Sequence, residues 1–158
     1  RMNKILAISI EDRQVSVQPG VVFDDLNRAL AKTGFFFPPN PASGKVATIG
    51  GNVATNAGGV KGAKYGTTRD YVLDLEVVLA DGQVIQTGGK LVKTSSGYDL
   101  TQLIIGSEGT LGLVTRIILK LLPRLQHRST LLVAFESVDK VTHDYMARYR
   151  AVAGSKRA

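Results

Sequence analysis

The segment ATIGGNVATNAGG, residues 47–59, constrains the fold more than any other part of the chain. It holds four glycines and two asparagines but no charged residue, and most of its side chains are too small to build a hydrophobic core. Glycine is expected where a backbone approaches a ligand or takes a positive φ, and successive backbone N–H groups in such loops form concave anion sites. The segment therefore indicates either a ligand cradle or a series of turns.

Three polar side chains in this segment have the same two interpretations. In a cradle, Asn52, Thr55 and Asn56 would add hydrogen bonds to ligand oxygens. In a series of turns they would cap and bond their own backbone. The usual nucleotide motifs are absent, because no glycine pair is spaced G-x-G and the GGK at 88–90 is followed by leucine rather than serine or threonine. A dinucleotide, if bound, is held in another way.

A second glycine cluster, GSEGTLG at 106–112, places Glu108 among glycines. Its carboxylate could accept hydrogen bonds from a ligand ring or hydroxyl. Taken alone, the motif favours a solvated loop acid.

Composition excludes several classes of protein. The chain has 158 residues, 44% of them hydrophobic and 21% charged, which is typical of one globular domain. There is no cysteine, and the two histidines, His127 and His143, lie far apart, so no metal site and no Ser-His-Asp triad is predicted. No run approaches the ~18 apolar residues of a membrane helix, and no charged-then-apolar leader is seen. We expect a cytoplasmic protein without a membrane span.

The net charge of +7 raises the question of an anionic partner. Residues 109–135 contain no acid and carry Arg116, Lys120, Arg124 and Arg128. A solvated strand edge followed by a loop is favoured over a polyanion-binding surface. Aromatic residues make up 6% of the chain and do not alternate with the basic ones, so no nucleic-acid partner is expected.

Local patterns predict an α+β chain with more strand than helix and without repeats or a domain linker. Residues 59–66 are interpreted as a loop, and Asp81-Gly82 as the turn of a hairpin over 71–89. Helices are predicted over 23–33, over 100–105 with Asp99 as N-cap, and over 138–152. The remaining strands are predicted at 4–10, 14–18, 110–123 and 130–136.

Several motifs occur in an order that resembles a known family. PNPASGKVATIGGNVATNAGGVKGAKYGTTRDYVLDLEVVLADGQVIQTGG is followed by KTSSGYDLTQLIIGSEGTLGLVT. The two segments resemble the FAD-binding (PCMH-type) domain of the vanillyl-alcohol-oxidase flavoproteins, especially the branch that holds the FAD-binding chain of glycolate oxidase and D-lactate dehydrogenase. The resemblance runs from about residue 1 to 122.

The resemblance implies two α+β subdomains that clasp an elongated FAD, followed by a substrate domain. Residues 1–122 would be a partial FAD-binding domain, mainly its second subdomain, with a mixed or antiparallel sheet flanked by helices. Residues 123–158 would begin the substrate (cap) domain, which is truncated. The first subdomain, with its own phosphate loop, would precede the chain.

The resemblance also implies which residues hold the cofactor. Residues 42–48 would line its pyrophosphate and ribityl region, 50–52 and 55–58 would form a wall, mainly of backbone, and 108–114 would surround its adenosine end. The implied contacts are Pro41, Ala42, Ser43, Ala47, Thr48, Gly50, Gly51, Asn52, Thr55, Asn56, Ala57, Gly58, Glu108, Gly109, Thr110, Leu111, Gly112, Leu113 and Val114.

The implied activity is oxidation of a 2-hydroxy acid, such as glycolate or D-lactate, to a 2-oxo acid, with a hydride passing to FAD and electrons to a separate acceptor. No catalytic residue is identified. The chain alone is expected to be inactive, with a homo-oligomer or a partner subunit covering its open surfaces. The alternative is a non-catalytic binding or subunit module of a larger flavoprotein complex.

Overall fold

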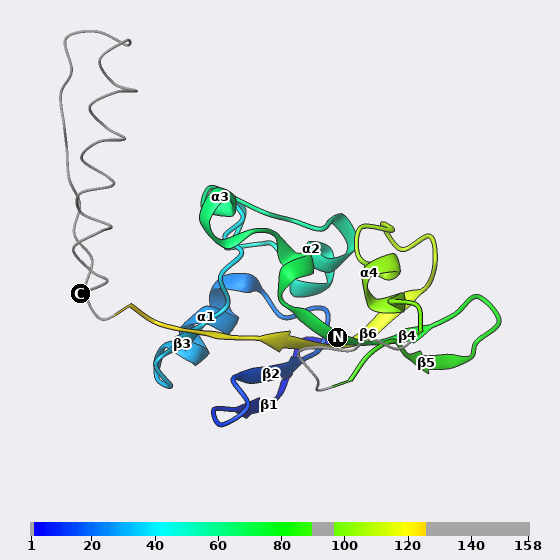
Figure 1. Cartoon of the computed structure of the whole chain (residues 1–158), viewed down its shortest axis with the longest axis horizontal. Helices are drawn as coiled ribbons and strands as arrows, with labels where there is room; N and C mark the ends of the chain where they lie inside the picture. The colour runs from blue at the N-terminus through cyan, green and yellow to red at the C-terminus, as the bar shows by residue number, and fades with distance from the viewer. Residues whose placement is uncertain (1, 90–96, 126–158) are drawn as a thin grey trace, which may run out of the picture. The chain divides into compact units, whose positions relative to one another are not determined.

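The computed structural model describes residues 2–89 and 97–125 (Figure 1). The chain divides into two units, Arg1–Arg124 and Leu125–Ala158, and the described residues belong almost entirely to the first. The strand predicted at 130–136 and the helix predicted at 138–152 lie outside the described residues. The domain assignment of 123–158 remains a prediction.

A five-stranded antiparallel sheet in the order β1-β2-β6-β4-β5 forms the centre of the first unit. A second sheet pairs two short strands, β3 and β7, also antiparallel. The strands are β1 (Ile5–Ser9), β2 (Gln14–Val17), β3 (Phe35–Phe36), β4 (Val72–Val78), β5 (Val84–Gln86), β6 (Leu113–Lys120) and β7 (Leu122–Pro123). The predicted α+β class with an antiparallel sheet is confirmed.

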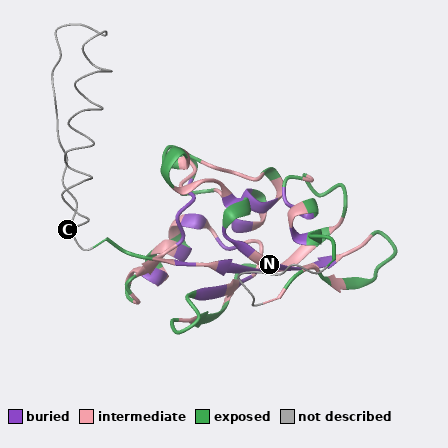
Figure 2. Cartoon of the chain, viewed as in Figure 1, coloured by how far each residue is buried: buried purple, intermediate pink, exposed green. Residues whose placement is uncertain are grey.

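The strand register follows the alternation of apolar residues in the sequence. Val15 of β2 lies opposite Leu119 of β6, and Val17 lies opposite Ile117. All four are buried, because alternate residues of a strand point to the same face of a sheet. Buried residues accordingly run along β2, β4 and β6 (Figure 2).

Two of the helices lie over one face of this sheet. The helical elements are α1 (Phe23–Ala31), α2 (Ile49–Thr55), α3 (Gly62–Tyr65), the 3-10 turn η1 (Thr68–Asp70) and α4 (Leu100–Ile104). In Figure 1, α2 and α4 lie over the same side of the central strands. Ile49 and Val53 of α2 join Leu75 and Ile117 of the sheet in one hydrophobic core.

Most local predictions agree with these elements, and three need correction. The 71–89 hairpin is confirmed, with Gly82 at φ 85° in its turn. The strand predicted over 110–123 is instead two strands in different sheets, β6 and β7. The loop predicted at 59–66 contains α3, and the glycine segment, interpreted as a cradle or a series of turns, contains α2. Among residues 2–89 and 97–125, no helix has the length and hydropathy needed to cross a membrane.

Candidate functional site

Helix α2 forms in the glycine segment because its ends are well capped. Thr48 is extended at the N-cap, and its Oγ1 accepts a hydrogen bond from the Gly51 N–H at 3.1 Å. Asn56 ends the helix in the left-handed conformation, at φ 50° and ψ 49°, which asparagine tolerates better than most residues. Thr55 donates its hydroxyl to the Gly51 carbonyl at 3.0 Å. Thr48, Thr55 and Asn56 therefore all serve the local structure of the helix.

A short backbone ladder places the start of α2 beside the segment that leads into α1. The N–H groups of Gly50 and Ile49 donate to the carbonyls of Pro19 and Val21 at 2.7 and 2.8 Å. Farther along, the Phe23 N–H donates to the Ala47 carbonyl at 2.9 Å, and the Asp24 N–H donates to the Gly44 carbonyl at 3.2 Å. We call this pairing of residues 19–24 with 44–50 the ladder.

The other end of α2 fixes the second glycine cluster. The last carbonyls of a helix have no partner within the helix. Here the Val53 carbonyl accepts from the Gly106 N–H and the Ala54 carbonyl accepts from the Glu108 N–H, both at 2.9 Å. The 106–109 loop can follow this path because Gly106 and Gly109 have φ of 84° and 79°. Two segments about fifty residues apart in the sequence thus form one surface.

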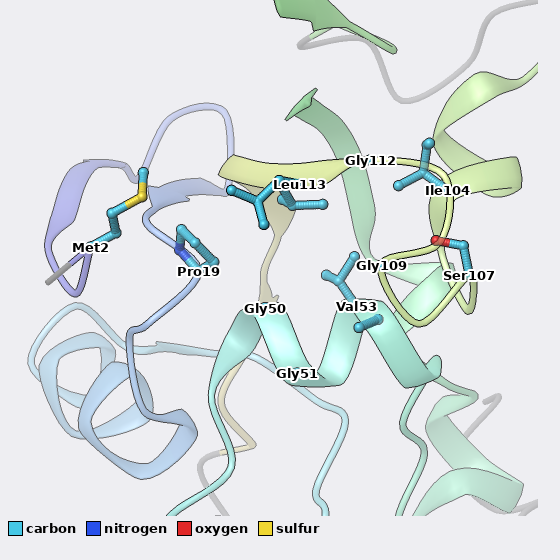
Figure 3. Close-up of a pocket in the computed structure, with 12 residues that line it drawn as sticks. Met2, Pro19, Gly50, Gly51, Val53, Ile104, Ser107, Gly109, Gly112 and Leu113 are labelled. Carbon is cyan, nitrogen blue, oxygen red and sulfur yellow. The ribbon is translucent and has the colours of Figure 1, made fainter. Parts of the chain in front are cut away.

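A pocket of about 360 Å³ opens on this surface, and we call it the glycine pocket (Figure 3). Its lining comes from α2, the last residue of α4, the 107–112 loop, the start of β6 and two residues near the N-terminus. No lining residue carries a charged side chain. The lining residues are Met2, Pro19, Gly50, Gly51, Val53, Ala54, Ile104, Ser107, Gly109, Gly112, Leu113 and Val114.

Half of this lining was among the predicted cofactor contacts: Gly50, Gly51, Gly109, Gly112, Leu113 and Val114. Sequence reasoning missed the other half. Val53, Ala54 and Ser107 lie inside the two glycine clusters, so the clusters themselves carried the signal. Met2, Pro19 and Ile104 lie outside both clusters and reach the pocket only through the fold.

Neighbouring glycines of this pocket serve different purposes. A Cβ atom at Gly50 would lie 2.5 Å from the Cβ of Pro19, and one at Gly112 would lie 2.5 Å from Cγ1 of Val77. Glycine at these two positions is required by the packing of the fold itself. At Gly51 the only atom within 4 Å of an added Cβ is Oγ1 of Thr48, at 3.2 Å, and at Gly109 there is none. Gly51 and Gly109 therefore leave open backbone surface.

A second pocket, of about 320 Å³, lies at the other end of the ladder. We call it the loop pocket. Its wall is a turn in which the Val46 and Ala47 N–H groups both donate to the Ser43 carbonyl at 2.8 Å. Its lining residues are Asp24, Asn40, Pro41, Ala42, Ser43, Gly44, Lys45 and Val46. Three predicted contacts, Pro41, Ala42 and Ser43, line it, and Asp24 and Lys45 bring charges that the glycine pocket does not have.

The other predicted contacts line neither pocket. They are Ala47, Thr48, Asn52, Thr55, Asn56, Ala57, Gly58, Glu108, Thr110 and Leu111. The Ala57 carbonyl accepts from both the N–H and the hydroxyl of Thr68, at 2.9 and 2.7 Å. Asn52 is only 3% exposed, and its Nδ2 has no hydrogen-bond partner among the described residues. Glu108 is exposed. A role for these residues in cofactor binding remains a prediction.

Among the described residues, one ionisable group has a clearly shifted pKa, and it lies outside both pockets. The Tyr71 hydroxyl donates to the Tyr65 carbonyl at 2.6 Å. Burial raises the pKa of Tyr71, and the nearby Asp70 and Tyr65 raise it further. Residues 2–89 and 97–125 hold no cluster of three or more His, Cys, Asp or Glu side chains able to bind a metal ion.

Comparison with known proteins gives a consistent set of relatives. A protein-family model described as an FAD binding domain matches residues 1–88. The chain is 55% identical over 138 residues to glycolate oxidase subunit GlcD of Bacillus subtilis (strain 168), which covers 87% of this chain and 29% of the relative. It is 47% identical to D-lactate dehydrogenase of Anaerostipes hadrus, over 88% of this chain and 29% of the relative.

A third relative extends the range of named activities. The chain is 40% identical to D-2-hydroxyglutarate dehydrogenase of Xanthomonas citri pv. viticola, over 96% of this chain and 32% of the relative. Among solved structures, alkyldihydroxyacetonephosphate synthase matches with a TM-score of 0.70 and 29% identity, over 80% of this chain and 22% of that one. The chain thus spans about 30% of the length of the curated relatives named here.

Proposed function

Because the chain belongs to the FAD binding domain family, we propose that it forms part of the FAD site of an oxidoreductase that converts a 2-hydroxy acid to a 2-oxo acid. FAD is the cofactor of this family, and relatives named as glycolate, D-lactate and D-2-hydroxyglutarate enzymes support the substrate class. The observation that carries the proposal is the convergence of both predicted glycine clusters on the glycine pocket.

The two pockets fit different parts of an FAD molecule. Ligand sites of drug-sized molecules are usually ~300–1,000 Å³ and mostly apolar, so the glycine pocket, at about 360 Å³, suits one ring system rather than the whole cofactor. We assign it to the adenosine end. Open backbone at Gly51 and Gly109 allows a flat ring to lie close to the chain.

The loop pocket suits the polar middle of the cofactor. The ladder joins it to the glycine pocket, since Pro19 and Gly50 line one while Asp24 and Gly44 line the other. An elongated ligand that follows the ladder would bring its pyrophosphate and ribityl groups to the turn of residues 41–46. Lys45 supplies the positive charge in the lining of this pocket, which would attract the phosphate groups.

The contribution of this chain is to bind and orient. When bound, FAD would supply the hydride acceptor for the oxidation, and a separate acceptor would then take the electrons. The residues of α2 and the 106–114 segment would exclude water from one end of the cofactor and fix its position. We propose that the isolated chain binds FAD without turning over a hydroxy acid, because none of the residues that the structure describes is assigned to substrate binding.

A titration of the 158-residue chain with FAD tests the proposal, with flavin fluorescence as the readout. Ala54 is a half-buried helical residue that lines the glycine pocket. Ala54→Leu should weaken FAD binding at least ~10-fold by filling the pocket, while leucine keeps a high helix propensity. Ala29→Leu is the matched control, since Ala29 is half-buried in α1 and lines neither pocket.

Two outcomes would contradict the proposal. If FAD fluoresces equally with and without the parent chain at every FAD concentration, the chain has no FAD site. Equal affinity in Ala54→Leu and the parent would place the cofactor elsewhere on the chain.

A further inference from the structure

An exposed arginine outside both pockets joins three segments of the framework. The Arg69 main-chain N–H donates to Oδ1 of Asn56 at 3.0 Å. Its Nη2 donates to the Ile105 carbonyl at 3.2 Å, and its own carbonyl accepts from Nε2 of Gln102 at 3.2 Å. One residue of η1 therefore contacts the C-cap of α2, the helix α4 and the residue that follows α4.

The contact with Ile105 lies immediately before the loop that forms one wall of the glycine pocket. Ile105 is 2% exposed, and the next residue, Gly106, takes a φ of 84°. From there the loop docks on the last carbonyls of α2 through the N–H groups of Gly106 and Glu108. Ser107 and Gly109, which lie on either side of Glu108, then line the pocket.

Asn56 holds the other end of this connection. Its left-handed backbone ends α2, and its side-chain oxygen fixes the main chain of Arg69. A Cβ atom at Gly106 would lie 3.6 Å from Cβ of Asn56 and 3.9 Å from Nη2 of Arg69. Asn56, Arg69 and Gly106 are thus close neighbours behind the pocket wall.

We propose that Arg69 is a positioning residue for the glycine pocket, acting through Ile105 to hold the 106–109 loop against α2 in the geometry that binds the cofactor. This inference rests on the proposed function, because FAD is the ligand whose affinity reports the geometry. It assigns no contact between Arg69 and the cofactor.

If Arg69 had a purely structural role, its loss would lower the melting temperature together with FAD affinity. A positioning role predicts a loss of affinity at nearly constant melting temperature. Each hydrophobic element that Arg69 joins is also held by the core, which includes Val53, Ile104 and Ile105. Loss of one hydrogen bond from an exposed arginine should leave global unfolding almost unchanged while it loosens the loop. Cofactor affinity and local amide exchange should therefore change without a matching change in the melting temperature.

The experiment compares the 158-residue chain with Arg69→Ala and Arg69→Lys. For each we measure the FAD dissociation constant, amide hydrogen exchange of residues 105–109 without FAD, and the thermal midpoint. Arg69→Ala should weaken FAD binding about fivefold, the equivalent of one ordinary hydrogen bond, and speed exchange in the loop. Arg69→Lys should restore most of the affinity, because an ammonium can still donate to the Ile105 carbonyl.

A second pair of variants tests the same connection from its other end. Asn56→Gly keeps the left-handed backbone but removes the acceptor for the Arg69 N–H, whereas Asn56→Asp keeps an oxygen in that position. Asn56→Gly should weaken binding more than Asn56→Asp does, and the double variant of Asn56→Gly with Arg69→Ala should be non-additive. The control is Arg28→Ala, which removes an exposed arginine paired with Asp25 at 2.6 Å on α1.

The outcomes separate this inference from the proposed function. If the parent chain binds FAD and Arg69→Ala binds it equally well, the inference is wrong and the proposed function stands. If the parent chain does not bind FAD, the proposed function fails and the positioning role falls with it. Equal losses in Arg69→Ala and Arg28→Ala, or a fall in affinity that only follows a fall in melting temperature, would also overturn the inference.

Discussion

The glycine pocket and the loop pocket take their shape from different kinds of structure. The first is built on α2 and β6, and its loop is tied to the helix by two hydrogen bonds of 2.9 Å. The second is formed by the 40–46 segment beside the start of α1, and Asp24 and Lys45 are in its lining. The glycine pocket is uncharged and the loop pocket carries charges of both signs, and the proposed placement of a ring in the first and polar groups in the second depends on this difference.

If both pockets hold parts of one ligand, as we propose, the ladder is the structure that connects them. It connects them through backbone hydrogen bonds alone, from Gly50 and Pro19 at one end to Gly44 and Asp24 at the other. Backbone bonds depend little on side-chain identity, so each pocket can change its lining without moving the other. Variants confined to one pocket should therefore have distinct effects.

The largest expected effect comes from Gly51→Val in the glycine pocket. The added Cβ meets only Oγ1 of Thr48 within 4 Å, and valine has a better helix propensity than glycine, so α2 should still form. We expect FAD affinity to fall ~100-fold because the branched side chain occupies ligand space. Gly62→Val is the matched control, since Gly62 lies in α3 and an added Cβ there meets nothing within 4 Å.

An equal loss of affinity in Gly51→Val and Gly62→Val would contradict the prediction, because only Gly51 lines the glycine pocket. Thermal midpoints of both variants should be recorded with the titrations. They show whether a loss of affinity comes from a loss of folded protein.

A smaller effect is expected from Lys45→Ala in the loop pocket. If the pyrophosphate lies there, FAD affinity should fall about fivefold, as expected for one exposed charge contact. The difference from the parent should shrink as salt is added, because salt screens exposed charges. Lys32→Ala, at an exposed position at the end of α1, should bind FAD as the parent does. A salt-independent loss in Lys45→Ala would argue against a charge contact.

The smallest effect is expected at Asn52, which lines neither pocket. Its buried Nδ2 lacks a partner among the described residues, and a buried unsatisfied donor costs about 1–3 kcal/mol. Asn52→Leu should therefore leave the unliganded chain equally stable or raise its stability by about 1 kcal/mol. FAD affinity is expected to change threefold or less, which is less than about 0.7 kcal/mol of binding free energy. Denaturant unfolding and FAD titration measure the two quantities.

A marked loss of stability in Asn52→Leu would show that the asparagine is satisfied in the folded chain. A large loss of affinity without loss of stability would instead make Asn52 a direct contact of the cofactor.

The strands and α1 could be predicted from the sequence because their signals are local. Val15 and Val17 alternate along a strand, and Phe23, Leu26 and Leu30 recur at helical spacing. Helix α2 was missed because two adjacent glycines lower helix propensity. Its caps, Thr48 and Asn56, and its buried pair at i and i+4, Ile49 and Val53, were the available signals.

The division of the predicted contacts between two pockets could not be predicted in the same way. It depends on the ladder, which pairs segments about twenty-five residues apart, and on the docking of the 106–109 loop to α2. Pro19 shows the difficulty, because its place beside Gly50 follows from a contact that no periodic pattern encodes. Strands β6 and β7 belong to different sheets for a similar reason, since β7 pairs with the distant strand β3.

Amide hydrogen exchange of the 158-residue chain with and without FAD tests the central claim most directly. Bound FAD should slow exchange in three segments, 41–46, 50–54 and 106–114, and leave β1 (Ile5–Ser9) unchanged, because the first two lie at the ends of the ladder and the third forms the opposite wall of the glycine pocket. FAD that binds without slowing exchange in 50–54 and 106–114, or that protects only segments outside both pockets, would contradict the account.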